Sequence, residues 1–206
     1  MTAPFGIILA GGQARRMGGG DKGLLLLAGK SLLSRVVARL APQVSTMALN
    51  ANGDPARFAD FDLPVLADSI AENPGPLAGV LAGLDWAAAQ GADRIVTAAA
   101  DTPFFPTDLV SRLSAVAEGM PHPLVLAATP DTTRGQIQHP TFGLWPVELR
   151  NDLRTALNGG LRKVVHWTGH HDAREALFCG HAKDPFFNVN TPEDLAQATT
   201  LLEASR

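Results

Sequence analysis

The chain has 206 residues, of which 46% are hydrophobic and 18% charged, the composition of a soluble globular protein with room for one α/β domain. Its formal net charge of −3 argues against a general binder of nucleic acid or anionic membranes, because such proteins usually carry a basic excess. Any site for an anion must therefore be built locally.

In the first half of the chain, short apolar runs alternate with longer helical patterns, which predicts parallel strands joined by crossover helices. Helices are expected from an N-cap at Ser31 to Leu40, from Pro76 to Gln90, where Gly79 and Gly83 share one face, and from Thr107 to Glu118. The expected strands are Phe5–Ala10, Thr46–Leu49, Val65–Ala67, Arg94–Ala99 and Leu124–Ala128.

Beyond Pro130 the pattern changes. The polar segment Thr132–Gln138 is expected to be a loop, and His139–Trp145 a strand facing the site. Further expected elements are helices at Val147–Leu157 and Leu161–Trp167, a strand at Phe186–Val189, and a C-terminal helix capped by Thr191 with Pro192 in its first turn.

The most distinctive segment is the glycine-rich, basic stretch LAGGQARRMGGGDKG at residues 9–23, which follows the first expected strand. Glycines let backbone N–H groups approach one anion closely, and Lys22 adds a positive charge that can follow a phosphate. The stretch matches neither the Walker loop nor the dinucleotide-binding G-x-G-x-x-G pattern. It therefore indicates a phosphate-binding loop of another class, the alternative being a flexible surface loop with solvated arginines. Asp21 is in a position to orient Lys22.

Polar residues also follow other expected strands: Asn50, Asp68 and Asp101. Because ligands of open parallel sheets bind outside the carboxyl ends of the strands, we expect these side chains to meet the glycine-rich loop. Asp101 beside a phosphate loop is the type of hard oxygen ligand that Mg²⁺ uses, although a turn before Pro103 is an alternative role. Asp68 suits a base or ribose contact, or a cap of the turn before Ser69.

Three pairs of residues are weaker candidates. Arg16 is able to stabilise phosphate charge as Lys22 does, whereas Arg15 is expected to be solvated. Asn188 and Asn190 flank Val189 with a spacing that turns both amides to one side, for a polar ligand or for a turn network. Arg162 and Lys163 form a basic patch that would suit a second anionic substrate or simply a solvated helix face.

Cys179 is the single cysteine, so no intrachain disulfide is possible and a reducing compartment is plausible. We expect Cys179 to be a small buried side chain rather than a nucleophile. The N-terminus has no basic region before its short apolar run, and no segment approaches the length of a membrane span. We therefore expect a cytoplasmic protein that binds neither membranes nor nucleic acid.

Taken together, the motifs resemble those of the molybdenum cofactor guanylyltransferases. The resemblance covers nearly the whole chain and rests on LAGGQARRMGGGDKGLL, NPGPLAGVLAGL, Asp101-Thr102-Pro103-Phe104, His139-Pro140-Thr141 and NVNTPEDLA, which occur in this order. It implies a three-layer, Rossmann-like fold of the glycosyltransferase-A type with a mostly parallel sheet. It also implies a single nucleotidyltransferase domain over residues 1–206, with a GTP-binding part at about 1–130 and an acceptor-binding part at about 131–206.

The resemblance implies site residues as well. Those implied to bind the nucleotide are Leu9, Ala10, Gly11, Gly12, Lys22, Asn50, Asp68 and Asp101. Asp101 would also bind the metal, and Lys22, Asp101 and Arg16 would act in catalysis. Gly19, Asn188 and Asn190 match family positions near the reacting groups, and Arg162 and Lys163, where the pattern departs modestly, are candidates for binding the acceptor.

The implied reaction transfers GMP from GTP to the terminal phosphate of molybdenum-bearing molybdopterin and releases pyrophosphate. Mg²⁺, with Mn²⁺ as an alternative, would assist, and transient contacts with cofactor-delivering proteins and apo-molybdoenzymes would follow. The terminal phosphate is already a nucleophile, so alignment and charge neutralisation are sufficient. The alternatives are a molybdopterin cytidylyltransferase or a sugar-phosphate nucleotidyltransferase of the same fold, and more remotely a GTP-binding module without chemistry.

Overall fold

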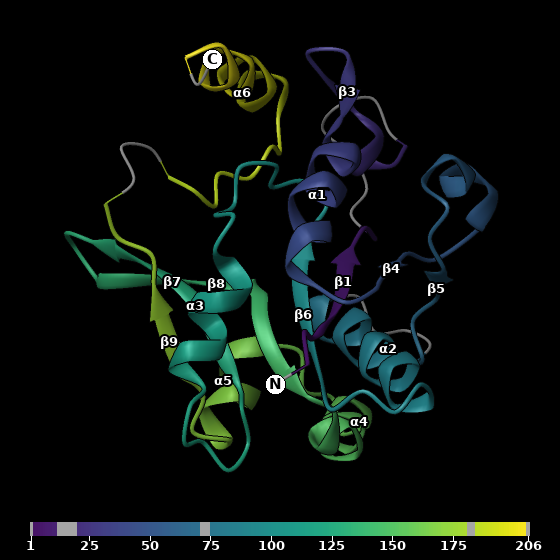
Figure 1. The fold of residues 1–206 in the computed structure, drawn as a ribbon, viewed down its shortest axis with the longest axis vertical. Helices are drawn as coiled ribbons and strands as arrows, with labels where there is room; N and C mark the ends of the chain where they lie inside the picture. The colour runs from purple at the N-terminus through teal and green to yellow at the C-terminus, as the bar shows by residue number, and fades with distance from the viewer. Residues whose placement is uncertain (1, 12–19, 71–74, 181–183, 205–206) are drawn as a thin grey trace.

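The computed structural model describes residues 2–11, 20–70, 75–180 and 184–204. Within them the central sheet has seven strands in the order β5-β4-β1-β6-β8-β7-β9 (Figure 1). Their bounds are β1 Phe5–Leu9, β4 Met47–Asn50, β5 Val65–Leu66, β6 Arg94–Ala99, β7 Val125–Asp131, β8 Gly135–Pro146 and β9 Arg174–Leu177. All pairings are parallel except those of β8, which runs antiparallel to both β6 and β7. The expected mostly parallel α/β sheet is confirmed.

Helices cover both faces of the sheet and make three layers (Figure 1). On one face, α1 (Leu32–Leu40) and α3 (Leu109–Val116) share a buried apolar cluster with sheet residues. On the other, α2 (Pro76–Ala89), α4 (Arg150–Asn158) and α5 (Val164–His170) share a second cluster. Because β6 is packed between these layers, all six of its residues are buried.

A smaller unit lies at the end of the molecule that carries the C-terminal helix. A short hairpin of β2 (Leu26–Leu27) and β3 (Lys30–Ser31) packs with α6 (Pro192–Glu203) through a third buried cluster. The remaining elements are short 3₁₀ turns, namely η2 Lys22–Leu24, η3 Ala41–Gln43, η4 Pro55–Phe61 and η5 Val147–Leu149. In the described ranges no helix has both the length and the apolar character needed to cross a membrane.

Local signals in the sequence account for several of these elements. The Ser31 side chain accepts a hydrogen bond from the backbone N–H of Ser34 and caps α1, and Thr191 and Asp194 form a capping box at the start of α6. Gly79 and Gly83 of α2 face the sheet, where added Cβ atoms would lie 2.1 Å from Asn50 and 2.6 Å from Ile7. The close approach expected of these glycines is confirmed.

Four local expectations are wrong. Thr132–Gln138 is not all loop, because β7 and β8 extend into an exposed hairpin around it; such a ribbon is solvated on both sides and tolerates polar residues. Phe186–Val189 is not a strand, and Leu161–Lys163 precede α5. Cys179 is exposed rather than buried, since it lies just after β9 at the edge of the sheet.

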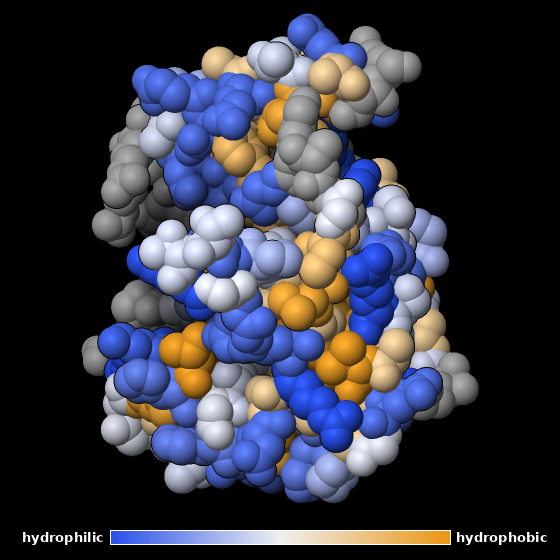
Figure 2. All heavy atoms as spheres, turned by 90° about the vertical axis from the view of Figure 1, so that its left-hand side faces the viewer, coloured by the Kyte–Doolittle hydropathy of each residue, from blue (hydrophilic) through white to orange (hydrophobic). Residues whose placement is uncertain are grey.

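Figure 2 shows the face of the molecule on the β9 side. Charged and polar side chains cover most of it, and apolar residues occur in groups between them. The surface is hollowed below the uppermost part, which carries α6.

Candidate active site

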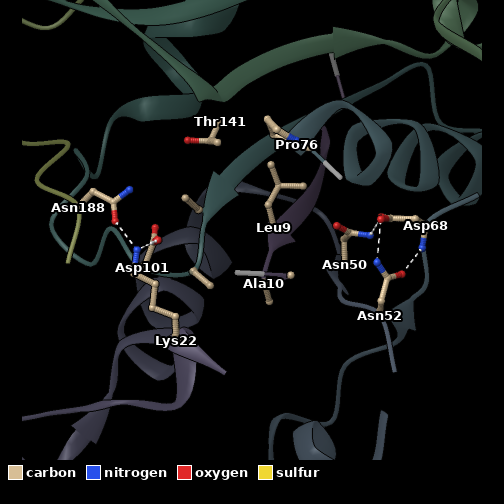
Figure 3. A pocket seen from close by; sticks show the side chains of 15 residues that line it. Leu9, Ala10, Lys22, Asn50, Asn52, Asp68, Pro76, Asp101, Thr141 and Asn188 are labelled. Carbon is tan, nitrogen blue, oxygen red and sulfur yellow. Dashed lines mark hydrogen bonds and ion pairs between the residues drawn. The ribbon is translucent and has the colours of Figure 1, made fainter. Parts of the chain in front are cut away.

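A cleft of about 600 Å³ opens at the carboxyl ends of β1, β4 and β6 (Figure 3). The described residues that line it are Leu9, Ala10, Gly11, Lys22, Gly23, Asn50, Asn52, Asp68, Gly75, Pro76, Ala99, Ala100, Asp101, Thr141 and Asn188. Lys22 and Asp101 lie at one end and Asn50 and Asp68 at the other, with Leu9 and Ala10 between them (Figure 3). The sheet thus brings together the polar strand ends that were expected to meet.

The first end, which we call the cation end, consists of Lys22, Asp101, Asn188 and Asn190. Lys22 Nζ donates hydrogen bonds to Asp101 Oδ2 at 2.5 Å, to Asn188 Oδ1 at 3.2 Å and to Asn190 Oδ1. The lysine is only 8% exposed, so its charge depends on these three oxygens. Asp101 therefore does not act only as a turn residue before Pro103.

The segment that carries the two asparagines is placed by Val189. Its side chain is fully buried and its N–H donates to the carbonyl of Asp101 at 2.9 Å. Asn188 and Asn190, on either side, are thereby turned toward Lys22, as their spacing predicted, although the segment is not a strand. Their amide oxygens bind a charged side chain, so the network is more than a turn.

The sequence suggested that Asp21 orients Lys22, but the Asp21 carboxylate pairs with another residue. It forms an ion pair with Arg57 of η4, with 2.6 Å between Oδ2 and Nε. Sequence reasoning missed Arg57, because the charged residues of a 3₁₀ turn carry no pattern that distinguishes a buried contact from a solvated one.

The second end, which we call the amide end, consists of Asn50, Asn52 and Asp68. Asn50 Nδ2 donates to Asp68 Oδ1 at 2.9 Å and to the carbonyl of Leu66 at 3.1 Å, and Asn52 Nδ2 donates to Asp68 Oδ2 at 2.8 Å. The Asp68 N–H donates in turn to Asn52 Oδ1 at 2.9 Å. Ser69 Oγ donates to Asp85 Oδ2, whereas the carboxylate oxygens of Asp68 accept from Asn50 and Asn52 rather than from the turn at Ser69.

Asn52 was also missed from the sequence. The available signal was its position two residues after Asn50, in the turn that follows the same strand. The Asn52 side chain bonds to both the carboxylate and the backbone N–H of Asp68, and so holds that residue at two points.

The upper wall of the cleft comes from β8. Thr141 lines the cleft (Figure 3). His139, two residues earlier, stacks on Phe186 with 4.3 Å between ring centres. His139 Nε2 lies 2.9 Å from Thr129 Oγ1, and burial lowers the pKa of the imidazole although Asp184 acts in the opposite direction. The expected strand His139–Trp145 is thus confirmed as part of β8, and its Thr141 faces the cleft.

Among the described candidates, Arg162 and Lys163 do not line the cleft. Arg162 and Lys163 are exposed, and Arg162 Nη1 donates to the carbonyls of Leu157 and Leu161. Gly12, Arg16 and Gly19 lie outside the described residues.

The donor set at the cation end fits a magnesium ion. Mg²⁺ takes oxygen ligands, typically one or two carboxylates together with water and substrate phosphates. Asp101 supplies one carboxylate, and two amide oxygens point at the same ammonium group. Within the described ranges no group of three or more His, Cys, Asp or Glu side chains is placed to hold a metal ion.

A mostly parallel sheet with a polar cleft at the carboxyl ends of its strands is a Rossmann-like arrangement, and solved nucleotidyltransferase structures share this fold. The chain aligns with molybdopterin-guanine dinucleotide biosynthesis protein A from Archaeoglobus fulgidus with a TM-score of 0.76, 21% identity, and coverage of 97% of this chain and 99% of that one. It aligns with 4-diphosphocytidyl-2C-methyl-D-erythritolsynthase from Anaerococcus prevotii with a TM-score of 0.73, 14% identity, and coverage of 98% and 96%.

Sequence comparison narrows the class. Residues 6–174 match the MobA-like NTP transferase domain. The chain is 50% identical over 203 residues to the molybdenum cofactor guanylyltransferase of Bradyrhizobium sp. (strain ORS 278), covering 97% of this chain and 93% of that protein. It is 50% identical over 199 residues to the protein of that name from Cereibacter sphaeroides, covering 96% of each. The chain belongs to the MobA-like NTP transferase family.

Proposed function

We propose that the protein transfers GMP from GTP to the terminal phosphate of molybdenum-bearing molybdopterin, releasing pyrophosphate and forming the guanine dinucleotide cofactor. The name of its relatives at 50% identity supports this reaction. The observation that carries it is the division of one cleft into the cation end around Lys22 and the amide end around Asp68, which suits a nucleoside triphosphate lying across Leu9 and Ala10.

The amide end favours guanine over cytosine. Both oxygens of Asp68 already accept a hydrogen bond from an asparagine, yet a carboxylate has about four lone-pair sites and can accept more. Guanine offers adjacent N–H donors on its Watson–Crick edge, whereas cytosine offers one amino group beside two acceptors. Acceptors facing a carboxylate repel it, so Asp68 selects against cytosine.

The cation end would stabilise the triphosphate. Lys22 is a point charge able to leave Asp101 and follow the phosphates, and the backbone at Gly11 is open to close approach, since a Cβ there would meet no described atom within 4 Å. Leu9, Ala10, Gly11 and Gly12 are proposed to contact the nucleotide. Arg16 is proposed to add a second positive charge.

Asp101 is proposed to hold Mg²⁺, or Mn²⁺, with the amide oxygens of Asn188 and Asn190 beside it. A bound cation would neutralise charge on the leaving pyrophosphate. The chain's own residues bind and align the two substrates, and the acceptor phosphate needs no activated side chain because it is itself the nucleophile.

The acceptor is proposed to approach past Asn188, Asn190 and Gly19, with Arg162 and Lys163 as outer candidates. This keeps the division into a GTP-binding part at about 1–130 and an acceptor-binding part at about 131–206. Contacts with cofactor-delivering proteins and apo-molybdoenzymes, and a cytoplasmic location, remain parts of the proposal.

The proposal is tested by pyrophosphate release with molybdopterin as acceptor, comparing GTP with CTP for the wild-type protein and for Asp101→Ala. We expect release with GTP and far less with CTP, and none from Asp101→Ala, which should keep the fold although loss of a partner of Lys22 lowers its thermal stability. Equal or faster release with CTP favours a cytidylyltransferase. Binding of GTP with no release would favour a non-catalytic GTP-binding module.

A further inference from the structure

Arg57 contacts segments next to both ends of the cleft without lining the cleft itself. Its Nε forms the ion pair with Asp21, while Nη1 donates to the carbonyl of Asp54 at 2.7 Å and Nη2 donates to the carbonyl of Asn52. One guanidinium group therefore contacts the residue before Lys22 and the turn that carries Asn52.

The turn at residues 52–54 is closed around this side chain. Gly53 has a φ of +87°, in the left-handed region, and a Cβ at this position would lie 3.0 Å from Arg57 Nη1. This conformation favours a glycine, and a side chain at position 53 would crowd the Arg57 guanidinium. The Arg57 guanidinium also packs over the ring of Phe58, with 4.7 Å between Arg57 Cζ and the ring centre.

Contacts continue from Arg57 to both ends of the cleft. Through Asn52 they reach Asp68, because the Asn52 side chain both donates to and accepts from that residue. Through Asp21 they reach the backbone next to Lys22. The Arg57 and Asp21 side chains are only 27% and 19% exposed, so solvent screens their ion pair less than it would a surface pair.

We propose that Arg57 is a positioning residue that holds the amide end and the cation end of the cleft in register. Its two terminal nitrogens fix the Asn52 turn, and hence Asp68, for the nucleobase. Its Nε fixes Asp21, so that this carboxylate stays away from the ammonium of the adjacent Lys22. The inference rests on the proposed function, since it assigns the two ends to the base and the phosphates of one nucleotide.

The two tasks of Arg57 can be separated by substitution. Arg57→Lys keeps a positive charge near Asp21 but loses the planar fork that donates to two carbonyls. Asp21→Asn removes the ion pair but leaves the fork and its carbonyl partners in place. Arg57→Met removes both.

The test measures the Kd of GTP by calorimetry and the kcat of pyrophosphate release. We expect Arg57→Lys to weaken GTP binding about tenfold with kcat nearly unchanged, the size of one lost charge-assisted hydrogen bond. Asp21→Asn, which removes an ion pair, should lower kcat up to about fivefold with a smaller change in Kd. Arg57→Met should show both effects. A purely structural role would not divide Kd from kcat in this way.

Arg112→Met is the matched control. Arg112 of α3 also pairs with a carboxylate, Asp108 at 2.7 Å, donates to a backbone carbonyl and packs over a phenylalanine ring, but it lies outside the lining of the cleft. It should leave Kd and kcat unchanged. Lysine and methionine variants of Arg57 that behave alike, or that bind GTP as the wild type does, would overturn the inference.

The calorimetric result also separates this inference from the proposed function. If the wild type binds GTP but releases no pyrophosphate, the proposed reaction fails, while a weaker Kd for Arg57→Lys would still support the positioning of the amide end. If the wild type turns over and none of these variants differs from it, the positioning role alone fails.

Discussion

The two ends of the cleft are built from very different parts of the chain. The amide end comes from one stretch, Asn50 to Asp68, on the neighbouring strands β4 and β5. The cation end joins Lys22 to residues 79 and 166 positions away, Asp101 and Asn188. A local turn therefore shapes one end, whereas the other exists only when the whole sheet and the segment before α6 are folded.

The two ends also differ in the groups that their hydrogen bonds join. At the amide end, side-chain amides and a carboxylate satisfy one another, which preserves the arrangement before any ligand arrives. At the cation end a nearly buried ammonium is held by oxygens that a metal could equally use. We infer that the amide end determines affinity and base choice, and that the cation end determines turnover.

The largest effect is expected for Lys22→Met. Loss of the charge that neutralises the phosphates should lower kcat by about 100-fold or more, the usual scale for removing one electrostatic contact to a transition state, while GTP binding changes less. Steady-state pyrophosphate release measures this. Lys30→Met, which removes an exposed lysine of β3 outside the cleft lining, is the control. A wild-type kcat for Lys22→Met would contradict the assignment of turnover to this end.

Asp68→Asn should act in the opposite way. Replacing one acceptor oxygen by a donor should weaken GTP binding by about tenfold and reduce the preference for GTP over CTP, with kcat at saturation little changed. Titration calorimetry with both nucleotides checks this, with Asp60→Asn, an exposed carboxylate of η4, as the control. If Asp68→Asn lowers kcat and leaves the nucleotide preference intact, the two ends are not divided as proposed.

The contrast between the ends also shows how far the sequence alone could lead. Strand-end residues such as Asn50, Asp68 and Asp101 could be placed together because parallel strands end at one edge of a sheet. The orientation of Asn188 and Asn190 was predicted from their spacing although the expected strand is absent, because one buried residue, Val189, is enough to set it.

Other features had no signal in the sequence. The Arg57–Asp21 pair joins two irregular segments whose approach depends on the packing of η4 against the sheet, through Phe58, rather than on any periodicity. The exposed part of the β7–β8 hairpin was predicted as a loop because most of its residues are polar. An apolar periodicity indicates which residues are buried, but it does not indicate which charged residues pair or which polar segments form a ribbon.

A smaller effect is expected from a pair of substitutions in α2. In Gly79→Ala the new Cβ would lie 2.1 Å from Asn50 Oδ1, and in Gly83→Ala 2.6 Å from Ile7 Cγ1. Both should destabilise the fold, by about 1–3 kcal/mol for overpacking less up to about 1 kcal/mol of gained helix propensity. Only Gly79→Ala displaces an amide-end side chain, so only it should also weaken GTP binding. Thermal unfolding and calorimetry on the two variants provide the comparison, and equal GTP binding by both would contradict it.

The smallest effect concerns His139, which packs beside the segment leading to the cation end. Burial lowers the pKa of His139 in the folded protein, so below the ordinary histidine pKa of about 6.5 the unfolded chain takes up a proton that the folded chain resists. Stability should therefore fall as the pH drops below about 6.5 and level off once the lowered pKa of the folded state is passed.

Because His139 stacks on Phe186, two residues before Asn188, protonation should loosen the cation end first and lower kcat before it weakens GTP binding. Denaturant unfolding and kinetics between about pH 5 and 8 test this. His139→Phe, which keeps a ring on Phe186 but cannot titrate, should show a shallower decline on the acid side, and an unchanged pH profile in that variant would assign the decline to other groups.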